Sequence, residues 1–230
     1  MDRLSPLDAS FLYLDSPTTP MTISSLAVYE GPAPAPKELR DMLSSKLHLV
    51  ARFRQRLAPV PLGWHRPMWV DDTTFDIDEH LQQIELNEQS EVHMLDLAAH
   101  LLSQPLCRSR PLWEMCLVTG LEHDRFAILS KTHHSMWDGI SGVDLHAVLL
   151  DDSPTRAPDG PAPRFTPTPE PTTLGMLFGA ARDRLRETRS LVSSVRDAVR
   201  DPIKTLTGMT QIAKDATCFV SSVARPARAS

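Results

Sequence analysis

The sequence predicts an α/β fold in which one mixed sheet is flanked by helices. Two kinds of apolar segment lead to this prediction. Residues 37–50 and 90–103 carry apolar side chains at helical spacing, whereas residues 22–29, 113–121 and 125–132 form short apolar runs typical of strands. The chain has 230 residues, of which 41% are hydrophobic, so it can bury a substantial core.

The first strand and the two helices follow from local patterns. The strand at 22–29 ends at the break GPAPAP, residues 31–36, because proline cannot donate a hydrogen bond to a sheet. The helix at 37–50 presents one apolar face, made of Leu39, Met42, Leu43, Leu47 and Val50. The helix at 90–103 presents a similar face, made of Val92, Leu95, Ala99 and Leu102. We expect both faces to pack on the sheet.

A hairpin follows the second helix. The runs at 113–121 and 125–132 are separated only by the polar turn EHD, which predicts an antiparallel pair. Ser141 is then predicted to be the N-cap of a helix over residues 142–150. The segment between hairpin and helix is therefore a strand-to-helix loop, and catalytic residues concentrate in such loops.

A proline-rich stretch divides the chain. Seven prolines fall in residues 153–173, so this segment can neither continue a helix nor join a sheet, and we interpret it as a linker. Residues 1–152 before it form the predicted main domain. Residues 174–230 after it carry apolar stripes at 174–199 and 203–223, which predict two amphipathic helices. Because such helices cannot bury their stripes alone, we expect them to lead toward a second domain that this chain lacks.

Charge and cysteine content exclude several classes of protein. The formal net charge is −5, with a balance of +5 in residues 174–230 and −10 in the rest. An acidic body argues against nucleic-acid binding, and the basic tail is a candidate membrane or partner surface. The three cysteines form no CxxC pair, and the N-terminus has no apolar signal core. We therefore expect a cytoplasmic protein whose membrane contact is peripheral.

The motif HHSMWDG, residues 133–139, is the candidate for chemistry. Histidine suits general base catalysis because its unperturbed pKa, about 6.5, lies near neutrality. An isolated histidine pair would more often be an ordinary feature of a loop, but here the pair sits between a predicted strand and a predicted helix. A metal site is disfavoured, since adjacent residues of a strand point in opposite directions and no other cluster has ligand spacing.

These residues resemble the bacterial wax ester synthase/diacylglycerol acyltransferase family. HHSMWDG matches the HHxxxDG signature of CoA-dependent acyltransferases, although Trp137 is bulkier than we expect there. The resemblance extends over about residues 4–152 and includes four further segments: PLDASF at 6–11, GWHRPMWV at 63–70, FDIDEH at 75–80 and SRPLWE at 109–114. Peptide-synthetase condensation domains share HHxxxDG but usually lack the PLDASF-like start and the PLWE segment.

The resemblance implies a fold and roles for four residues. The fold would be a chloramphenicol-acetyltransferase-like sandwich, one half of a two-domain CoA-dependent acyltransferase, followed by linker helices. His134 would be the general base and His133 a supporting residue. Asp138 would hold the loop structurally, and Gly139 would allow its backbone geometry. For Glu114 the sequence itself leaves two roles open, that of a buried ion-pair partner and that of a residue facing the substrate channel.

The implied reaction transfers a fatty acyl group from acyl-CoA to diacylglycerol or to a long-chain alcohol. Acyl-CoA is a substrate, and neither a cofactor nor a metal is expected. The alternative is a non-catalytic or split homologue that binds lipid or acyl-CoA. Expected partners are a C-terminal-half protein or a second copy of the chain, with peripheral contact at the membrane or at lipid droplets.

Overall fold

The computed structural model describes residues 2–137 and 163–200. The chain divides into two compact units, Met1–Leu174 and Gly175–Ser230, and each is described by itself. The first unit contains the main sheet and the histidine pair. The second contains most of helix α5, Thr173–Arg200. The assignment of residues 1–152, 153–173 and 174–230 to a domain, a linker and connecting helices stays a prediction.

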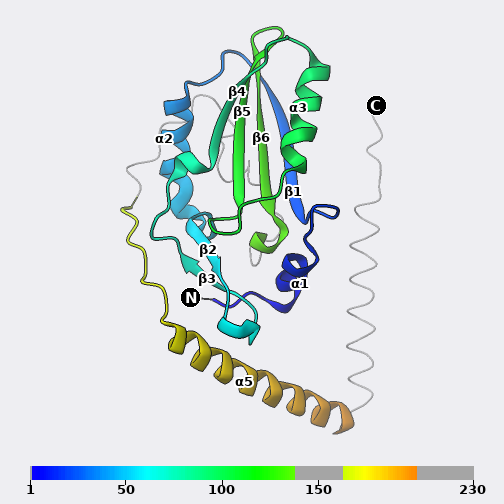
Figure 1. The fold of residues 1–230 in the computed structure, drawn as a ribbon, viewed down its shortest axis with the longest axis vertical. Helices are drawn as coiled ribbons and strands as arrows, with labels where there is room; N and C mark the ends of the chain where they lie inside the picture. Colours follow the sequence, from blue (N-terminus) through cyan, green and yellow to red (C-terminus); the bar gives the residue numbers. More distant parts are fainter. Residues whose placement is uncertain (1, 138–162, 201–230) are drawn as a thin grey trace. The chain divides into compact units, whose positions relative to one another are not determined.

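The main sheet has four strands in the order β1-β6-β5-β4 (Figure 1). The strands are β1 (Thr22–Glu30), β4 (Leu81–Glu85), β5 (Trp113–Leu121) and β6 (Arg125–His133). The pairs β1–β6 and β5–β6 are antiparallel, and β4 pairs with β5 in parallel. The mixed sheet predicted from the sequence is therefore confirmed.

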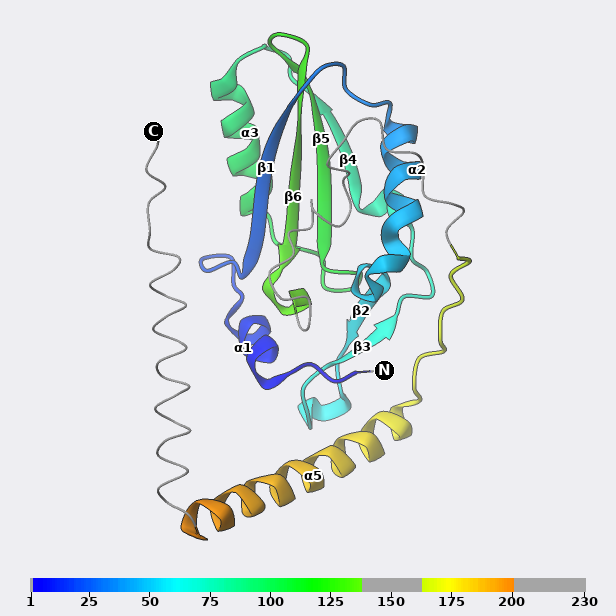
Figure 2. The same ribbon diagram turned by 180° about the vertical axis from the view of Figure 1, so that it is seen from behind.

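Two helices cover the sheet from opposite faces, as Figures 1 and 2 show. Helix α2 (Pro36–Lys46) shares one core cluster with Met115 and Leu117, and helix α3 (Glu91–Ser103) shares another with Cys116 and Val118. Successive side chains of a strand point to opposite faces, so β5 feeds both clusters in turn. Both predicted helices are confirmed, although α2 ends at Lys46 and the chain continues in 3-10 turns.

The β5–β6 hairpin is confirmed together with its polar turn. His123 and Asp124 adopt the left-handed backbone conformation, with φ of 63° and 53°. Hairpin turns commonly need this conformation, and aspartate tolerates it better than most residues. Gly120 also has positive φ, 81°, and a Cβ at this position would lie 2.9 Å from the Leu86 carbonyl oxygen. Because residue 120 is glycine, the irregular part of β5 can lie close to Leu86, the residue that follows β4.

Several short elements were not predicted. They are helix α1 (Pro6–Leu14), strands β2 (Gln55–Ala58), β3 (Met68–Asp71) and β4, and the 3-10 helices Leu47–Leu49, Ala51–Arg54, Pro61–Gly63, Ile77–Glu79 and His134–Trp137. Strands β2 and β3 form a separate antiparallel pair. Four residues are too few for a periodic signal. Helix α1 does carry a local signal, because the Ser5 hydroxyl accepts a hydrogen bond from the Asp8 N–H and Pro6 opens the helix.

The described part of the proline-rich stretch lies along the β2–β3 pair. The Arg54 guanidinium lies 4.1 Å from the centre of the Phe165 ring, the Thr168 N–H donates to Asp71, and Glu170 pairs with Arg56. The long helix predicted at 174–199 is confirmed as α5. No described helix is long and apolar enough to cross a bilayer. The helix expected at 142–150 and the stripe at 203–223 lie outside the described residues.

Glu114 forms an ion pair, as the first of its two predicted roles requires. Its carboxylate lies 3.2 Å from Lys131 Nζ and accepts a hydrogen bond from Arg110. The Lys131 side chain is only 3% exposed, and its ammonium also donates to the carbonyls of Leu101 and Gln104 at the end of α3. A buried ammonium needs such partners because it has lost its water. Lys131 thereby ties α3 to the hairpin.

We predict that Glu114→Ala destabilises the protein strongly. The substitution leaves the buried Lys131 charge with carbonyl partners only, and breaking a buried pair from one side typically costs about 3–5 kcal/mol. Urea denaturation measures the free energy of unfolding. Asp41→Ala is the matched control, because it breaks the exposed Lys37–Asp41 pair and should cost less than about 1 kcal/mol. Equal losses in the two variants would contradict the prediction.

Candidate active site

The histidine pair lies where β6 ends. His133 is the last residue of the strand, and its N–H donates to the Leu112 carbonyl at 2.9 Å. His134 begins the 3-10 helix that follows, and its N–H donates to the Met21 carbonyl at 2.8 Å. The His133 backbone is thus bonded to the residue that precedes β5, and the His134 backbone to the residue that precedes β1. Asp138 and Gly139 lie outside the described residues.

The His133 side chain is buried and acts as a hydrogen-bond acceptor at Nδ1. The Ser135 N–H donates to Nδ1 at 3.1 Å, and the Ser135 hydroxyl lies 2.7 Å from the same atom. Because Nδ1 accepts, the proton of the neutral ring is on Nε2. Burial lowers the pKa of His133 to about 4, despite the opposing effect of Asp15. His133 is therefore neutral near pH 7, and its ring holds the backbone of the residue after His134.

His134 is in a different environment. Its ring stacks on Phe11 of α1, with the ring centres 4.2 Å apart and the planes inclined by 24°. The residue is half-buried. No hydrogen bond joins a His134 ring nitrogen to any residue in the described ranges. The stacked phenyl ring thus restrains the imidazole, and within the described residues no hydrogen bond occupies the ring nitrogens, an arrangement that general base catalysis can use.

Asp15 lies beside the pair, at the C-terminal end of α1. Its carboxylate accepts hydrogen bonds from the Met21 N–H and from Arg108, both at 2.9 Å, and lies 3.7 Å from His133 Nε2. Partial burial raises the pKa of Asp15, but the Met21 N–H, Arg108 and His133 outweigh it, and the pKa lies below its usual value. Asp15 is therefore ionised near neutral pH.

An aromatic stack supports the start of β5. The His80 ring stacks on Trp113 with ring centres 4.5 Å apart and on Phe75 with ring centres 5.4 Å apart. His80 Nδ1 donates to the Trp113 carbonyl at 2.8 Å, and Trp113 Nε1 donates to the Phe53 carbonyl at 3.0 Å. These contacts join the segments at 75–80 and 109–114 in the core, next to Leu112, to which His133 is bonded.

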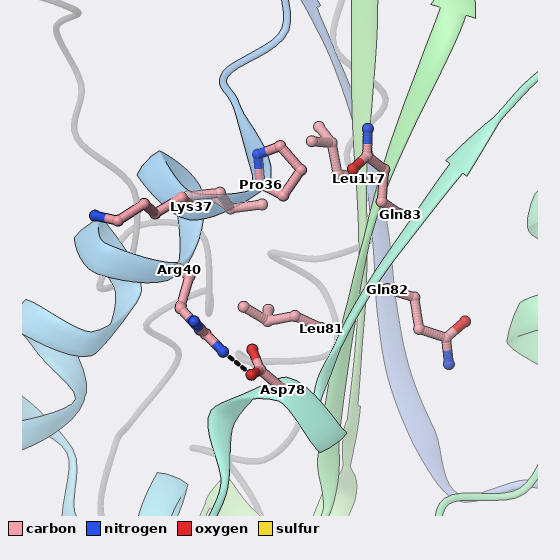
Figure 3. Close-up of a pocket in the computed structure, with 9 residues that line it drawn as sticks. Pro36, Lys37, Arg40, Asp78, Leu81, Gln82, Gln83 and Leu117 are labelled. Atoms are coloured by element: carbon pink, nitrogen blue, oxygen red, sulfur yellow. Dashed lines mark ion pairs between the residues drawn. The ribbon is translucent and has the colours of Figure 1, made fainter.

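A pocket of about 300 Å³ lies between α2 and β4 but contains neither histidine (Figure 3). The Arg40–Asp78 ion pair lies at its edge. The pocket is lined by Pro36, Lys37, Leu39, Arg40, Asp78, Leu81, Gln82, Gln83 and Leu117. None of these residues contacts the histidine pair in a hydrogen bond or ring contact of the described structure. We therefore place the candidate chemistry at the end of β6 and not in this pocket.

The structure brings together residues that sequence reasoning treated separately. The segment at 6–11 supplies Phe11 against His134, and the segment at 109–114 supplies the Leu112 carbonyl to His133. Asp15 and Arg108 were not predicted as site residues, because nothing local connects them to residue 133. Among the described residues, no group of three or more histidine, cysteine or acidic side chains could hold a metal ion.

A family model and curated relatives identify this chain as a member of one acyltransferase family. Residues 4–229 match the family described as the wax ester synthase/diacylglycerol acyltransferase catalytic domain. The probable diacylglycerol O-acyltransferase tgs3 of Mycobacterium tuberculosis is 34% identical over 86% of this chain and 73% of that protein. The probable diacylglycerol O-acyltransferase tgs1 of the same species is 40% identical over 66% of this chain and 34% of that protein.

A solved structure shows the same fold. The wax ester synthase/diacylglycerol acyltransferase from Marinobacter aquaeolei matches 60% of this chain with a TM-score of 0.51 and 34% identity. The match covers 36% of that chain. The fold class predicted from the sequence is confirmed, and the chain matches only about a third of the length of this structure and of tgs1.

We predict that His133 makes stability depend on pH between about pH 4, its pKa in the folded protein, and pH 6.5, the ordinary pKa of histidine. The folded-state pKa is the lower one, so the unfolded chain binds more protons in this window and stability falls as the pH falls. His133→Asn should reduce that slope, and the buried His80, whose pKa is also lowered by burial, should account for part of what remains. Urea midpoints at pH 7, 6 and 5 measure the effect.

His100→Asn is the control, because His100 is exposed on α3. It should keep the wild-type slope. A wild-type slope in His133→Asn as well would show that His133 is not held neutral by the fold.

Proposed function

Because the chain belongs to the wax ester synthase/diacylglycerol acyltransferase family, we propose that it contributes the general base of an O-acyltransferase. The proposed donor is acyl-CoA, with no additional cofactor, and the acceptor is the hydroxyl of diacylglycerol or of a long-chain alcohol. The observation that carries the proposal is His134 itself, whose ring is stacked on Phe11 and makes no hydrogen bond within the described residues. This available base favours catalysis over a non-catalytic, lipid-binding role.

The proposed reaction needs one proton to move twice. His134 takes the proton of the acceptor hydroxyl as the oxygen attacks the thioester carbonyl carbon. A carbon–oxygen bond forms, the carbon–sulfur bond then breaks, and the protonated His134 returns the proton to the departing sulfur of CoA. The products are an ester and free CoA. We propose that His133 supports this step indirectly. Its Nδ1 accepts the Ser135 N–H and so keeps the backbone next to His134 in place while His134 gains and loses the proton.

We assign structural roles to the next two residues of the motif. Asp138 is proposed to hold the loop after His134, and Gly139 to allow a backbone path that a side chain would block. Neither residue is proposed to touch the reacting atoms. A loop held in this way would keep His134 oriented toward the acceptor hydroxyl.

We propose that the active site has a second wall besides the region described in this structure. The matched region corresponds to about a third of the Marinobacter enzyme. Acyl transfer needs the hydroxyl and the thioester held together in a site that excludes water. A C-terminal-half protein or a second copy of the chain would provide the remaining wall, and the isolated chain would then turn over slowly. Assays of the chain with and without such a partner test this part of the proposal.

We predict that His134→Ala lowers turnover by about 10²–10⁴-fold, the usual contribution of general base catalysis. The assay follows acyl transfer from acyl-CoA to diacylglycerol, with the partner half present where it is needed. Circular dichroism checks that the variant is folded. His100→Ala, on the exposed side of α3, should keep wild-type turnover. Near-normal turnover in folded His134→Ala would rule out His134 as the base.

Helix α5 is proposed to contact a membrane or lipid-droplet surface. Its exposed apolar residues include Leu174, Phe178 and Leu185. Arg182, Arg184 and Arg186 lie in the same stretch of the helix and could pair with anionic headgroups. The same apolar residues would also suit packing on a second domain, and vesicle binding distinguishes the two roles.

We predict that Phe178→Asp with Leu185→Asp reduces binding to vesicles of phosphatidylcholine and phosphatidylglycerol. The two carboxylates would have to enter the headgroup region, which opposes insertion of an amphipathic helix. Liposome flotation measures the bound fraction. Leu95→Asp is the control, because Leu95 is an exposed leucine on α3. If the double variant floats as well as the wild type, α5 is not the membrane contact.

A further inference from the structure

Asp15 contacts three parts of the molecule that hold the histidine pair. Its own N–H donates to the Phe11 carbonyl at 3.0 Å and so closes the last turn of α1. One carboxylate oxygen accepts the Met21 N–H at 2.9 Å, and the other accepts from Arg108. Arg108 also donates to the Leu12 carbonyl at 3.0 Å, which fastens α1 a second time.

These contacts lead directly to His134. The Met21 peptide is shared: its N–H donates to Asp15, and its carbonyl accepts the His134 N–H at 2.8 Å. Helix α1 in turn carries Phe11, whose ring stacks on the His134 imidazole. A displacement of the Asp15 carboxylate would therefore be transmitted to both the backbone and the ring of His134.

The same carboxylate also faces His133. The Ser135 N–H donates to Nδ1 of His133, so the ring proton is on Nε2. Nε2 is buried and has no hydrogen-bond partner within the described residues, and the second carboxylate oxygen of Asp15 lies 3.7 Å from it. A hydrogen bond would need a distance of about 2.7–3.2 Å. Catalytic contacts are often long in the free protein and tighten when substrate binds.

We propose that Asp15 is a positioning residue for the proposed acyl transfer. Its carboxylate stabilises the Nε2–H tautomer that the Ser135 N–H already requires of His133 and, through Met21 and α1, holds His134 in place. This inference rests on the proposed function for its effect on turnover, but the tautomer of His133 can be measured without any assay of activity. Arg108 contributes by keeping the carboxylate oriented toward His133.

The charge state of Asp15 is what distinguishes positioning from general structural support. In Asp15→Asn the amide oxygen can still accept the Met21 N–H, but the amide NH₂ would face both Arg108 and His133 Nε2–H, and two donors cannot bond to each other. His133 would then place its proton on Nδ1, so that Nε2 accepts. The Ser135 N–H would lose its acceptor, and the residue following His134 would no longer be held.

The experiment combines a tautomer measurement with kinetics on the full chain. Nitrogen-15 NMR of the histidine rings should show wild-type His133 protonated at Nε2, with His133→Asn used to assign its signals. Asp15→Asn should shift the proton to Nδ1 and lower kcat by roughly 10–100-fold, the effect expected from misplacing a catalytic group by about an ångström. KM for acyl-CoA should change less than kcat, and Asp15→Glu should restore the tautomer and most of the turnover.

The matched control is Asp41→Asn, which removes the charge of an exposed aspartate in an ion pair far from the histidines in the sequence. It should change neither the tautomer nor kcat. The inference is overturned if wild-type His133 carries its proton on Nδ1, a measurement that needs no variant to fold. It is also overturned if Asp15→Asn keeps the Nε2–H tautomer, or changes the tautomer without lowering kcat in an enzyme that depends on His134. If turnover of the wild type did not depend on His134, the proposed general base would be overturned instead of the role of Asp15.

Discussion

Burial of the C-terminal end of β6 determines the chemistry of both histidines. His133 is in the last position of the strand, where burial lowers its pKa to about 4 and keeps the ring neutral. A neutral ring has one acceptor nitrogen, and the Ser135 N–H uses it. If His133 were charged, both nitrogens would be donors and this bond would be lost. The loop that carries His134 thus depends on the environment of its neighbour.

Two adjacent residues of the same type can therefore have different tasks. The chain passes from strand β6 into a 3-10 helix between the two histidines, so their side chains meet different surroundings. His133 points into the protein, toward Ser135 and Asp15, whereas His134 meets the phenyl ring of Phe11. A buried histidine that must stay neutral is a poor base near pH 7, because its pKa is far below the working pH. His134 is half-buried instead, and its ring nitrogens make no hydrogen bond within the described residues.

The hairpin that delivers the pair is held by interactions away from the site. Lys131, two residues before His133, joins Glu114 of β5 to the last carbonyls of α3. Trp113, opposite Thr132 in the register, is packed against His80 and bonded to the Phe53 carbonyl. The register between β5 and β6 is what places Leu112 beside His133. The resemblance segments at 75–80 and 109–114 therefore act mainly through packing and pairing.

Local patterns in the sequence were sufficient for the mixed α/β class, both flanking helices, the hairpin and its turn, and for the histidine pair at the end of a strand. These features can be predicted because hydrophobic periodicity and turn residues act between positions only a few residues apart in the sequence. They did not reveal β2, β3 and β4, whose four or five residues are too short for a period to show. Tertiary structure alone decided that His133 is the buried member of the pair and that Glu114 neutralises Lys131. It also decided that Phe11 stacks on His134, that Asp15 faces His133 and that Arg108 binds Asp15. Each of these contacts, apart from Glu114–Lys131, joins positions 25 or more apart in the chain, and all of them depend on strand register and on the burial that several segments produce together.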